Sequence, residues 1–346
     1  MPVLELLQAR VSAGTTWRVV QLTDGDGAYG LGEYSDAGPG AAGVWAAVAA
    51  GLAEGGSVSA VVAGLNRRGP LAVRTVRGAL ELAAADLAAR RTGQPLWRWL
   101  GGTEPRPVAR HASIDRALRL RTPEEFAEVA RAAVADGYRA VKCAPFDGLP
   151  AKVRLRVGLA RAVAVRRAVP QAGLMVDVHG LLRVDDVLAS ARELGALGLR
   201  WLEDAAPVAS LRAVAGIAPL AGGELAADLS ELQPALQEGL LAWVLPDVKH
   251  AGGFRAATSL VSAALGAGAG VSLHNPAGPV ATAAGVHLAV ALGPSVETEF
   301  AYGETAWRAD AVRPAEAGAG AWLRPAAGPG LGLELDRRRW TLERAW

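Results

Sequence analysis

Cysteine, lysine and histidine are scarce in this chain of 346 residues. It contains one cysteine, Cys143, with three lysines and five histidines. One cysteine cannot form an intramolecular disulfide or a thiolate metal cage, and it suits a reducing compartment, so we expect a cytoplasmic protein. The small number of lysines and histidines also leaves few side chains for proton transfer near neutral pH.

The chain also lacks a charge excess and long apolar runs. Its 36 basic and 34 acidic residues give a net charge of +2, which leaves no cationic field to hold a polyanion, so we expect no nucleic acid partner. No apolar run reaches the roughly 20 residues of a membrane span. The first residues lack a basic stretch before a long apolar run, so we expect no signal peptide and no membrane association. With 51% apolar residues, the chain can bury a sizeable core, and its length predicts two domains.

The first hundred residues differ in pattern from the rest. Residues 3–34 alternate apolar and polar positions around glycine turns, which predicts an antiparallel meander. Helical spacing of apolar residues follows over residues 40–65 and 73–92. We therefore predict an α+β capping domain over residues 1–105.

From residue 107 the pattern becomes short apolar strands alternating with amphipathic helices. Eight strands are predicted: Val108–Ile114, Ala140–Ala144, Leu174–Val178, Arg200–Leu202, Leu220–Gly223, Ala242–Leu245, Val271–Leu273 and Ser295–Thr298. Helices are predicted between them, among others over 123–136, 151–168, 185–195 and 279–292. Eight strands that alternate with helices predict an α/β fold, a (β/α)8 TIM barrel over residues 106–310. A doubly wound sheet is the competing architecture. Residues 311–346 would form a C-terminal segment that returns to the capping domain.

In such a barrel the functional side chains lie where the strands end. The polar residues in these positions are Lys142, Asp177, His179, Glu203, Glu224, Asp247, Lys249, His274, Glu297 and Glu299. His287 instead lies in mid-helix among alanine and leucine, where a buried structural imidazole is the simpler expectation.

Three of these carboxylates, Asp177, Glu203 and Glu224, end three successive strands. Any one of them alone is better explained as a helix N-cap. Three on adjacent strands would converge and repel one another unless a cation lay between them. Hard oxygen ligands in this number predict a Mg²⁺ site.

Two histidines are expected beside that site. Asp177 and His179 are two residues apart in an extended run, so their side chains should point the same way. His274 ends a later strand and Asp247 ends the strand before it, which brings a carboxylate within reach of the imidazole. Such a pair fixes the tautomer of the imidazole and raises its basicity, as a general base requires.

At this point the residues resemble the enolase superfamily, and within it the mandelate racemase-like subgroup. The resemblance rests on the helix from Ala79 to Leu87 that ends in Gly93-Gln94-Pro95-Leu96-Trp97, the ordered carboxylates Asp177, Glu203 and Glu224, the segment Leu245–Gly253 and the sequence His274-Asn275-Pro276. It implies that the three carboxylates bind Mg²⁺, which holds a substrate carboxylate while a base removes the α-proton and an enediolate forms.

Departures from the family pattern narrow the expected reaction. Asp247 stands where muconate lactonizing-type members carry a catalytic lysine, and Ala144 stands where racemases carry the second lysine of Lys-x-Lys. His179 resembles the general acid of galactonate dehydratase-type members. The resemblance therefore implies an acid-sugar dehydratase, in which His274 takes the α-proton with Asp247 behind it and His179 protonates the departing 3-hydroxyl.

The remaining roles follow from the same resemblance. Lys142 would neutralise the enediolate, and either Glu297 or Glu299 would bind the substrate carboxylate, with Lys249 as a further substrate-binding residue. The product would be a 2-keto-3-deoxy acid.

Three alternatives stay open. One is a racemase or epimerase of a hydroxy or amino acid derivative on the same metal site, with Lys142, His179 or Lys249 as the second acid/base. Another is a Schiff-base aldolase that uses Lys142 or Lys249, and the third is an inactive binding barrel. In the enzymatic readings the partner is a small carboxylate substrate, and we expect a homo-oligomer.

Overall fold

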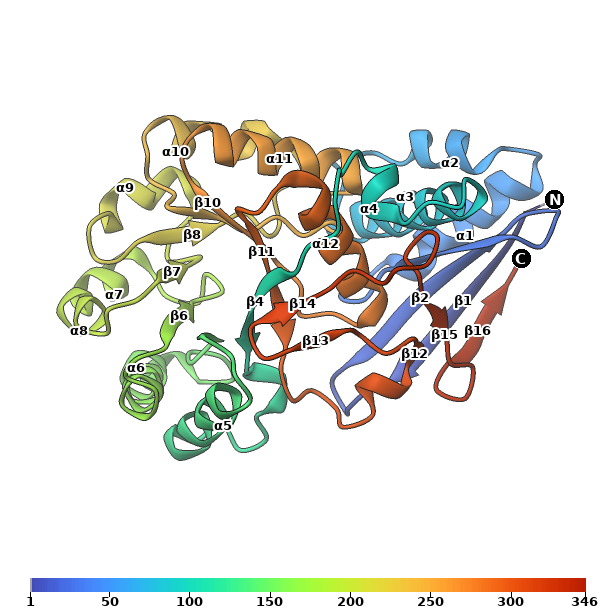
Figure 1. Cartoon of the computed structure of the whole chain (residues 1–346). Coiled ribbons are helices and arrows are strands. Elements are labelled where there is room, and N and C mark those ends of the chain that lie inside the picture. Colours follow the sequence, from blue (N-terminus) through green and yellow to red (C-terminus); the bar gives the residue numbers. More distant parts are fainter. Residues whose placement is uncertain (1) are drawn as a thin grey trace.

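The computed structural model describes residues 2–346, which form a parallel barrel beside an antiparallel sheet (Figure 1). The barrel strands are β4 (Val108–Ser113), β5 (Ala140–Cys143), β6 (Gly173–Asp177), β7 (Trp201–Glu203), β8 (Leu220–Gly222), β9 (Trp243–Val244), β10 (Gly270–Leu273) and β11 (Val296–Ala301). Each pairs in parallel with the next, and β11 pairs with β4. The sheet is therefore closed, the predicted (β/α)8 barrel is confirmed, and a doubly wound sheet is excluded.

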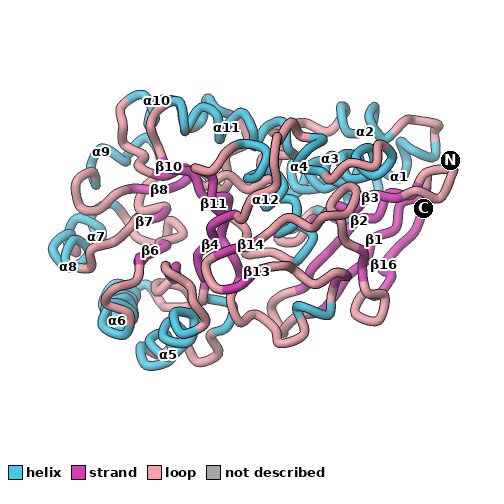
Figure 2. The backbone as a smooth tube through the Cα atoms, in the orientation of Figure 1, coloured by secondary structure: helices cyan, strands magenta, loops and turns pink. Residues whose placement is uncertain are grey.

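The helices of the barrel surround the strands (Figure 2). They are α5 (Pro123–Ala135), α6 (Ala151–Ala168), α7 (Val184–Ala189), α8 (Ala191–Ala196), α9 (Leu211–Val214), α10 (Gln233–Gln237), α11 (Phe254–Gly266) and α12 (Pro279–Leu292). The single helix predicted over 185–195 is divided at Ser190, whose hydroxyl donates to the carbonyl of Asp186. Such a bond back to the preceding turn competes with the regular helical pattern.

The N-terminal part consists of a sheet and four helices. These elements are β1 (Val3–Arg10), β2 (Thr16–Thr23), β3 (Tyr29–Glu33), α1 (Ala41–Ala53), α2 (Val58–Gly64), α3 (Leu71–Arg91) and α4 (Leu96–Trp99). The prediction of one helix over 40–65 is wrong, because Gly55 adopts φ +88° and ends α1, and the Ser57 side chain then caps α2 by accepting from the Ala60 amide.

The C-terminal segment contains the short strands β12 (Val312–Arg313), β13 (Gly318–Ala319), β14 (Trp322–Leu323) and β15 (Glu334–Leu335), and then β16 (Thr341–Ala345). Strand β16 pairs with β1, so the sheet order is β16-β1-β2-β3. The two termini consequently lie side by side (Figure 1), and backbone hydrogen bonds connect Leu4 with Trp346.

The barrel interior is layered along the strands. Its lower layer is apolar and includes Met175 on β6 and Trp201 on β7, both fully buried. Two residues further along, the same faces of these strands present Asp177 and Glu203. Because side chains alternate with a period of two, the apolar layer fixes the direction of the carboxylates above it.

A buried carboxylate connects the capping sheet to the barrel through hydrogen bonds. The Glu33 carboxylate at the end of β3 is fully buried and accepts from the Gly278 and Ala281 amides, at the start of α12. It thus caps α12 from another part of the chain.

Within residues 2–346, no helix has both the length and the apolar character needed to cross a membrane.

Candidate active site

Three carboxylates converge at the C-terminal face of the barrel. Asp177 and Glu203 end β6 and β7 as paired neighbours, and Glu224 follows β8 after Gly223, whose φ is +105°. One ligand atom from each of the three lies within 4.8 Å of the others. Asp177 and Glu203 are 1% and 0% exposed, so their charges are concentrated away from water.

The charge balance of this group fits a hard divalent cation. Burial, and then the neighbouring Asp177 carboxylate, raise the pKa of Glu203 well above its usual value. Such a shift is the mark of like charges held together in a low-dielectric site. A cation among the three carboxylates would relieve that repulsion, and an all-oxygen donor set suits Mg²⁺.

Lys142 lies against the same carboxylates from β5. Its Nζ is 2.9 Å from Glu203 Oε1, 3.1 Å from Glu299 Oε1 and 3.5 Å from Asp177 Oδ2. Burial alone lowers the pKa of Lys142, but Glu203 and Glu299 outweigh it and raise this pKa well above the usual value. Lys142 is therefore a permanent positive charge in the site.

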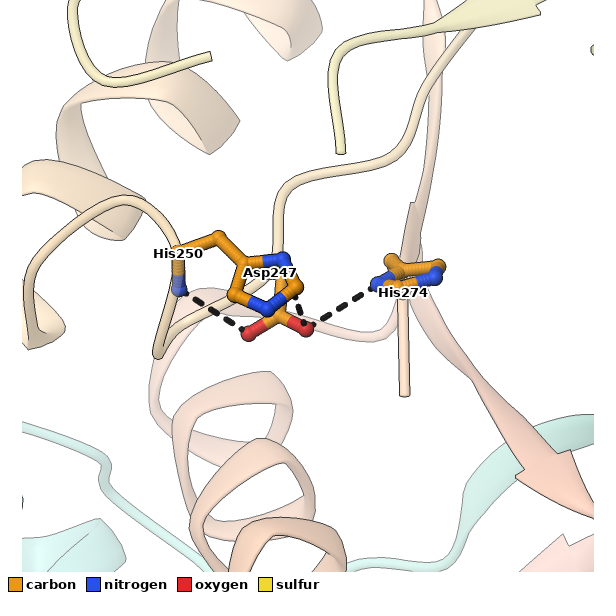
Figure 3. A group of neighbouring side chains, drawn as sticks. All are labelled: Asp247, His250 and His274. Carbon is orange, nitrogen blue, oxygen red and sulfur yellow. Dashed lines mark hydrogen bonds and ion pairs between the residues drawn. The ribbon is translucent and has the colours of Figure 1, made fainter. Parts of the chain in front are cut away.

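His274 and Asp247 form a hydrogen-bonded pair on one side of the site (Figure 3). His274 Nδ1 is 3.0 Å from Asp247 Oδ2, and its Nε2 is 3.0 Å from Glu224 Oε2. Although burial lowers the pKa of His274, Glu224 and the bond to Asp247 raise it well above the usual value. The Asp247 carboxylate thus orients the imidazole so that Nε2 faces the three carboxylates.

Asp247 is itself held in place by its neighbours. Its Oδ1 accepts from the backbone amides of Lys249 and His250, at 2.7 and 3.2 Å, and its Oδ2 accepts from Lys249 Nζ at 2.8 Å. Asp247, His250 and His274 could also surround an ion (Figure 3). The ammonium group already bound to Asp247 makes them the weaker candidate.

His179 lies on the other side of the site. Its Nε2 is 3.1 Å from Asp177 Oδ2, and its Nδ1 is 2.9 Å from Asp147 Oδ1. Burial opposes the charge, but the bonds to Asp147 and Asp177 raise the pKa of His179 to about 12. With 40% of its side chain exposed, His179 is a protonated group at the rim of the site.

The reason expected for the closeness of Asp177 and His179 is wrong. Strand β6 ends at Asp177, and His179 adopts φ +48°, in the left-handed region rather than in an extended run. The Asp177 carboxylate stabilises this turn by accepting from the His179 amide at 2.9 Å. Such a conformation in a non-glycine residue is uncommon and is concentrated at functional sites.

The structure separates the two candidate glutamates on β11. Glu299 Oε1 contacts Lys142, and its Oε2 accepts from the Asn275 amide at 3.1 Å, directly after His274. Glu297 instead pairs with Arg200 Nη2 at 2.8 Å, on the residue before β7, and so lies toward the opposite end of the barrel. Of the two, only Glu299 lies beside the carboxylate group.

Lys249 does not lie where a substrate-binding residue was expected. Its side chain is 2% exposed and its ammonium group is bound to Asp247. It therefore supports the His274–Asp247 pair from behind and has no exposed surface with which to bind a substrate.

Asp147 belongs to the site but was absent from the sequence prediction. It lies in the loop after β5, four residues beyond Cys143, where it accepts from His179. Its signal was the same as for the other site residues, a polar residue after a barrel strand. Lys142 is the nearer polar residue on the same strand, and Asp147 follows it in the loop.

Comparisons with known proteins agree with this geometry. Residues 125–339 match the family described as enolase C-terminal domain-like. A D-galactonate dehydratase family member from Streptomyces bingchenggensis is 28% identical over 302 residues, which are 78% of this chain and 73% of that protein. A D-gluconate dehydratase from Thermoproteus tenax is 27% identical over 275 residues, which cover 76% of this chain and 55% of that protein.

Solved structures share the whole fold. A mandelate racemase/muconate lactonizing enzyme from Jannaschia superposes with a TM-score of 0.83 at 25% identity, over 99% of this chain and 98% of that one. A protein from Salmonella enterica described as a putative dehydratase gives a TM-score of 0.84 at 22% identity, over the full length of both chains. The second likeness is one of fold alone.

Proposed function

This chain belongs to the enolase C-terminal domain-like family, and on that basis we propose that it is a hydro-lyase that dehydrates a sugar acid or a small hydroxy acid to a 2-keto-3-deoxy acid. The observation that carries the proposal is the placement of His274 and His179 on two sides of one carboxylate group. Dehydration needs one base for the α-proton and one acid for the departing hydroxyl, and the site offers one imidazole for each task.

Asp177, Glu203 and Glu224 would hold Mg²⁺, and the bound ion would supply Lewis-acid stabilisation of the negative charge that develops on the substrate carboxylate. Lys142, permanently protonated, adds a second positive charge on the same side. Glu299 lies next to Lys142, and to hydrogen-bond a substrate carboxylate it must carry a proton to donate. Burial raises the pKa of Glu299, but Lys142 outweighs burial and lowers it in the free site.

His274 is the proposed base and acts through Nε2. A base must carry no proton on that nitrogen, but the contact with Glu224 favours the protonated form. Glu224 must therefore take its other proposed role, as a metal ligand, before His274 can accept a proton. Asp247 remains bound to Nδ1 throughout and stabilises the imidazolium that results.

His179 is the proposed acid. Asp147 is bound to Nδ1 and favours the protonated ring, whereas Asp177, as a proposed metal ligand, would release the Nε2 proton toward a substrate hydroxyl at the partly exposed rim of the site. It would donate to the 3-hydroxyl as water leaves, and the enol product would tautomerise to the keto acid.

Two alternatives lose support from the contacts of the lysines. A Schiff-base nucleophile must be a neutral amine. Burial opposes the charge of both lysines, but carboxylate neighbours raise the pKa of Lys142 and of Lys249. Both ammonium groups are also bound to buried carboxylates. For an epimerase, Lys249 is covered by Asp247, which leaves His179 or Lys142 as the second group.

The direct test is a screen of sugar acids, beginning with D-galactonate and D-gluconate, for 2-keto-3-deoxy acid formation in the presence of Mg²⁺. Activity should disappear with a chelator and return when Mg²⁺ is added. Keto-acid formation that persists without any divalent ion would contradict the metal role.

The base is tested by α-proton exchange in D₂O with two matched variants. His274→Asn should abolish exchange, and His250→Asn should retain it, because His250 lies beside Asp247 but is 4% exposed and makes no contact with the three carboxylates. Exchange without keto-acid formation would favour an epimerase and reject dehydration.

A further inference from the structure

A cavity lies outside the candidate active site, in the capping part of the molecule. It encloses about 470 Å³, and its lining residues all come from 6–45 and 343–346. None belongs to a barrel strand. Its volume is within the range of small-molecule sites, roughly 300 to 1,000 Å³.

Hydrogen-bond donors without partners surround this cavity. The Trp45 indole N–H lacks a hydrogen-bond partner within residues 2–346, and the Tyr34 hydroxyl has the Glu343 carboxylate near it but forms no hydrogen bond of good geometry. Each of these side chains is only 2% exposed, and both line the cavity. Burial, and then the Glu343 carboxylate, raise the pKa of Tyr34, so its hydroxyl keeps its proton. Buried donors without acceptors are costly, and a bound ligand would satisfy them.

The N-terminus of helix α1 also faces the cavity. Gly40 precedes this 13-residue helix with no side-chain cap, and Ala41 and Ala42 of its first turn line the cavity. The first amides of a helix lack partners within the helix, and they favour an anionic acceptor.

Charged side chains complete the lining. Within residues 2–346, Arg18 and Arg344 form no ion pair, whereas Asp36 is bound to Arg116 at 2.9 Å. Glu343 is the remaining carboxylate in the lining. A ligand with only anionic groups would be repelled by Glu343. One that also carries hydroxyl groups can donate to it.

We propose that this cavity is a second binding site, for a small hydroxylated carboxylic acid. The carboxylate would bind at Arg18 and the first turn of α1, and the hydroxyl groups would bind at Tyr34, Trp45 and Glu343. The site is formed partly by the loops at residues 13–16 and 36–40, which also contact the barrel through Thr15 and Asp36. An acid bound there would contact both loops.

The test measures D-gluconate binding by calorimetry to the full chain with Mg²⁺, in a His274→Asn background so that no acid is consumed. Adding Arg18→Ala and Arg344→Ala should remove one binding site or weaken it at least about tenfold, since the ligand carboxylate would lose its charge-assisted hydrogen bonds. D-Glucitol, which has the hydroxyl groups but no carboxylate, should not bind to this site.

Trp45→Phe provides a second variant, since it keeps an aromatic ring at this buried position and removes the indole donor. It should weaken the same binding event, measured well below its melting temperature, which the smaller side chain also lowers. Equal stoichiometry and affinity in the parent and in both sets of variants would overturn the proposal. So would a change of oligomeric state in the arginine variants without loss of gluconate binding, because the cavity would then be an interface between copies. The expected loss of one site is the same whether or not D-gluconate is a substrate of the barrel site.

Discussion

At the residue scale, the site combines positions that follow from strand periodicity with others that do not. Asp177 and Glu203 could be predicted because apolar strands fix which residue comes last and parallel strands end at one face. The conformation of His179 could not, since φ +48° depends on the Asp177 carboxylate that holds the turn. The pattern of residue types along the sequence does not predict such a hydrogen bond.

Glu297 and Glu299 show the same limit. They are two residues apart on β11, so periodicity gives both side chains the same direction. What separates them is depth along the strand, together with the identity of the cation each one meets, Arg200 or Lys142. The depth of a residue within a barrel depends on the stagger between neighbouring strands, and the sequence of a single strand does not predict that stagger.

These two glutamates form a matched pair for mutation. Glu299→Gln should lower kcat/KM at least about 100-fold, because it removes a charge that lies on Lys142 beside the reacting groups. Glu297→Gln should leave kcat/KM unchanged and lower only thermal stability, through loss of the bond to Arg200. Steady-state kinetics on the acid identified in the screen provides the measurement. A loss of activity in the Glu297 variant and not in the Glu299 variant would reverse the assignment.

At the element scale, the capping part depends on very close packing of β3 against α3. A Cβ atom at Gly32 would overlap the carbonyl oxygen of Ala79, and one at Gly30 would overlap that of Ala83. Glycine at both positions therefore lets the strand approach the helix backbone directly. Both glycines lie in the stretch 3–34 for which glycine turns are predicted, because composition alone does not distinguish a turn from a close approach.

Gly32→Ala should lower the free energy of unfolding by about 2–4 kcal/mol, since the overlapping atom belongs to backbone that cannot move aside without shifting α3. Gly25→Ala is the control, because a Cβ there meets nothing within 4 Å, and it should change stability by less than about 0.5 kcal/mol. Urea denaturation of the two variants gives both values. Equal destabilisation would mean that the β3–α3 contact is not the cause.

Helix α12 is joined to α4 and to the C-terminal segment through His287. Its Nδ1 accepts from the Trp97 amide at 2.9 Å, and its Nε2 lies 3.3 Å from the Leu331 carbonyl oxygen. An imidazole that accepts at one nitrogen and donates at the other must be neutral. Burial accordingly lowers the pKa of His287 to about 4.

This neutral histidine predicts a loss of stability in acid. The unfolded chain takes up a proton on His287 near pH 6.5, but the folded chain does so only near pH 4. The stabilisation is therefore complete above pH 6.5 and is lost as the pH falls toward 4, by up to about 3 kcal/mol. His287→Gln keeps an acceptor for the Trp97 amide but does not titrate, so its stability should fall less over that range. Identical pH profiles for the two proteins, measured by denaturant titration, would contradict this.

At the scale of the whole molecule, the site depends on contacts between residues far apart in the chain. Glu304, whose side chain is 1% exposed, accepts from the Trp17 indole at 3.2 Å and pairs with Arg116 at 3.1 Å. Arg116 also binds Thr15 and Asp36 in the capping loops. The barrel and the capping part could each be predicted from local patterns. The contacts that join them could not, because 287 residues separate Trp17 from Glu304.

Arg116 therefore ties both capping loops to the barrel, and its removal should act on substrate binding more than on chemistry. Arg116→Ala should raise KM about tenfold with a smaller change in kcat, since the loops at Thr15 and Asp36 would lose their contact with the barrel while His274, His179 and Lys142 stay in place. Arg119→Ala, three residues away on an exposed side chain, is the matched control and should leave both constants unchanged. A fall in kcat alone, with KM unaltered, would place Arg116 in the chemical step instead of in loop closure.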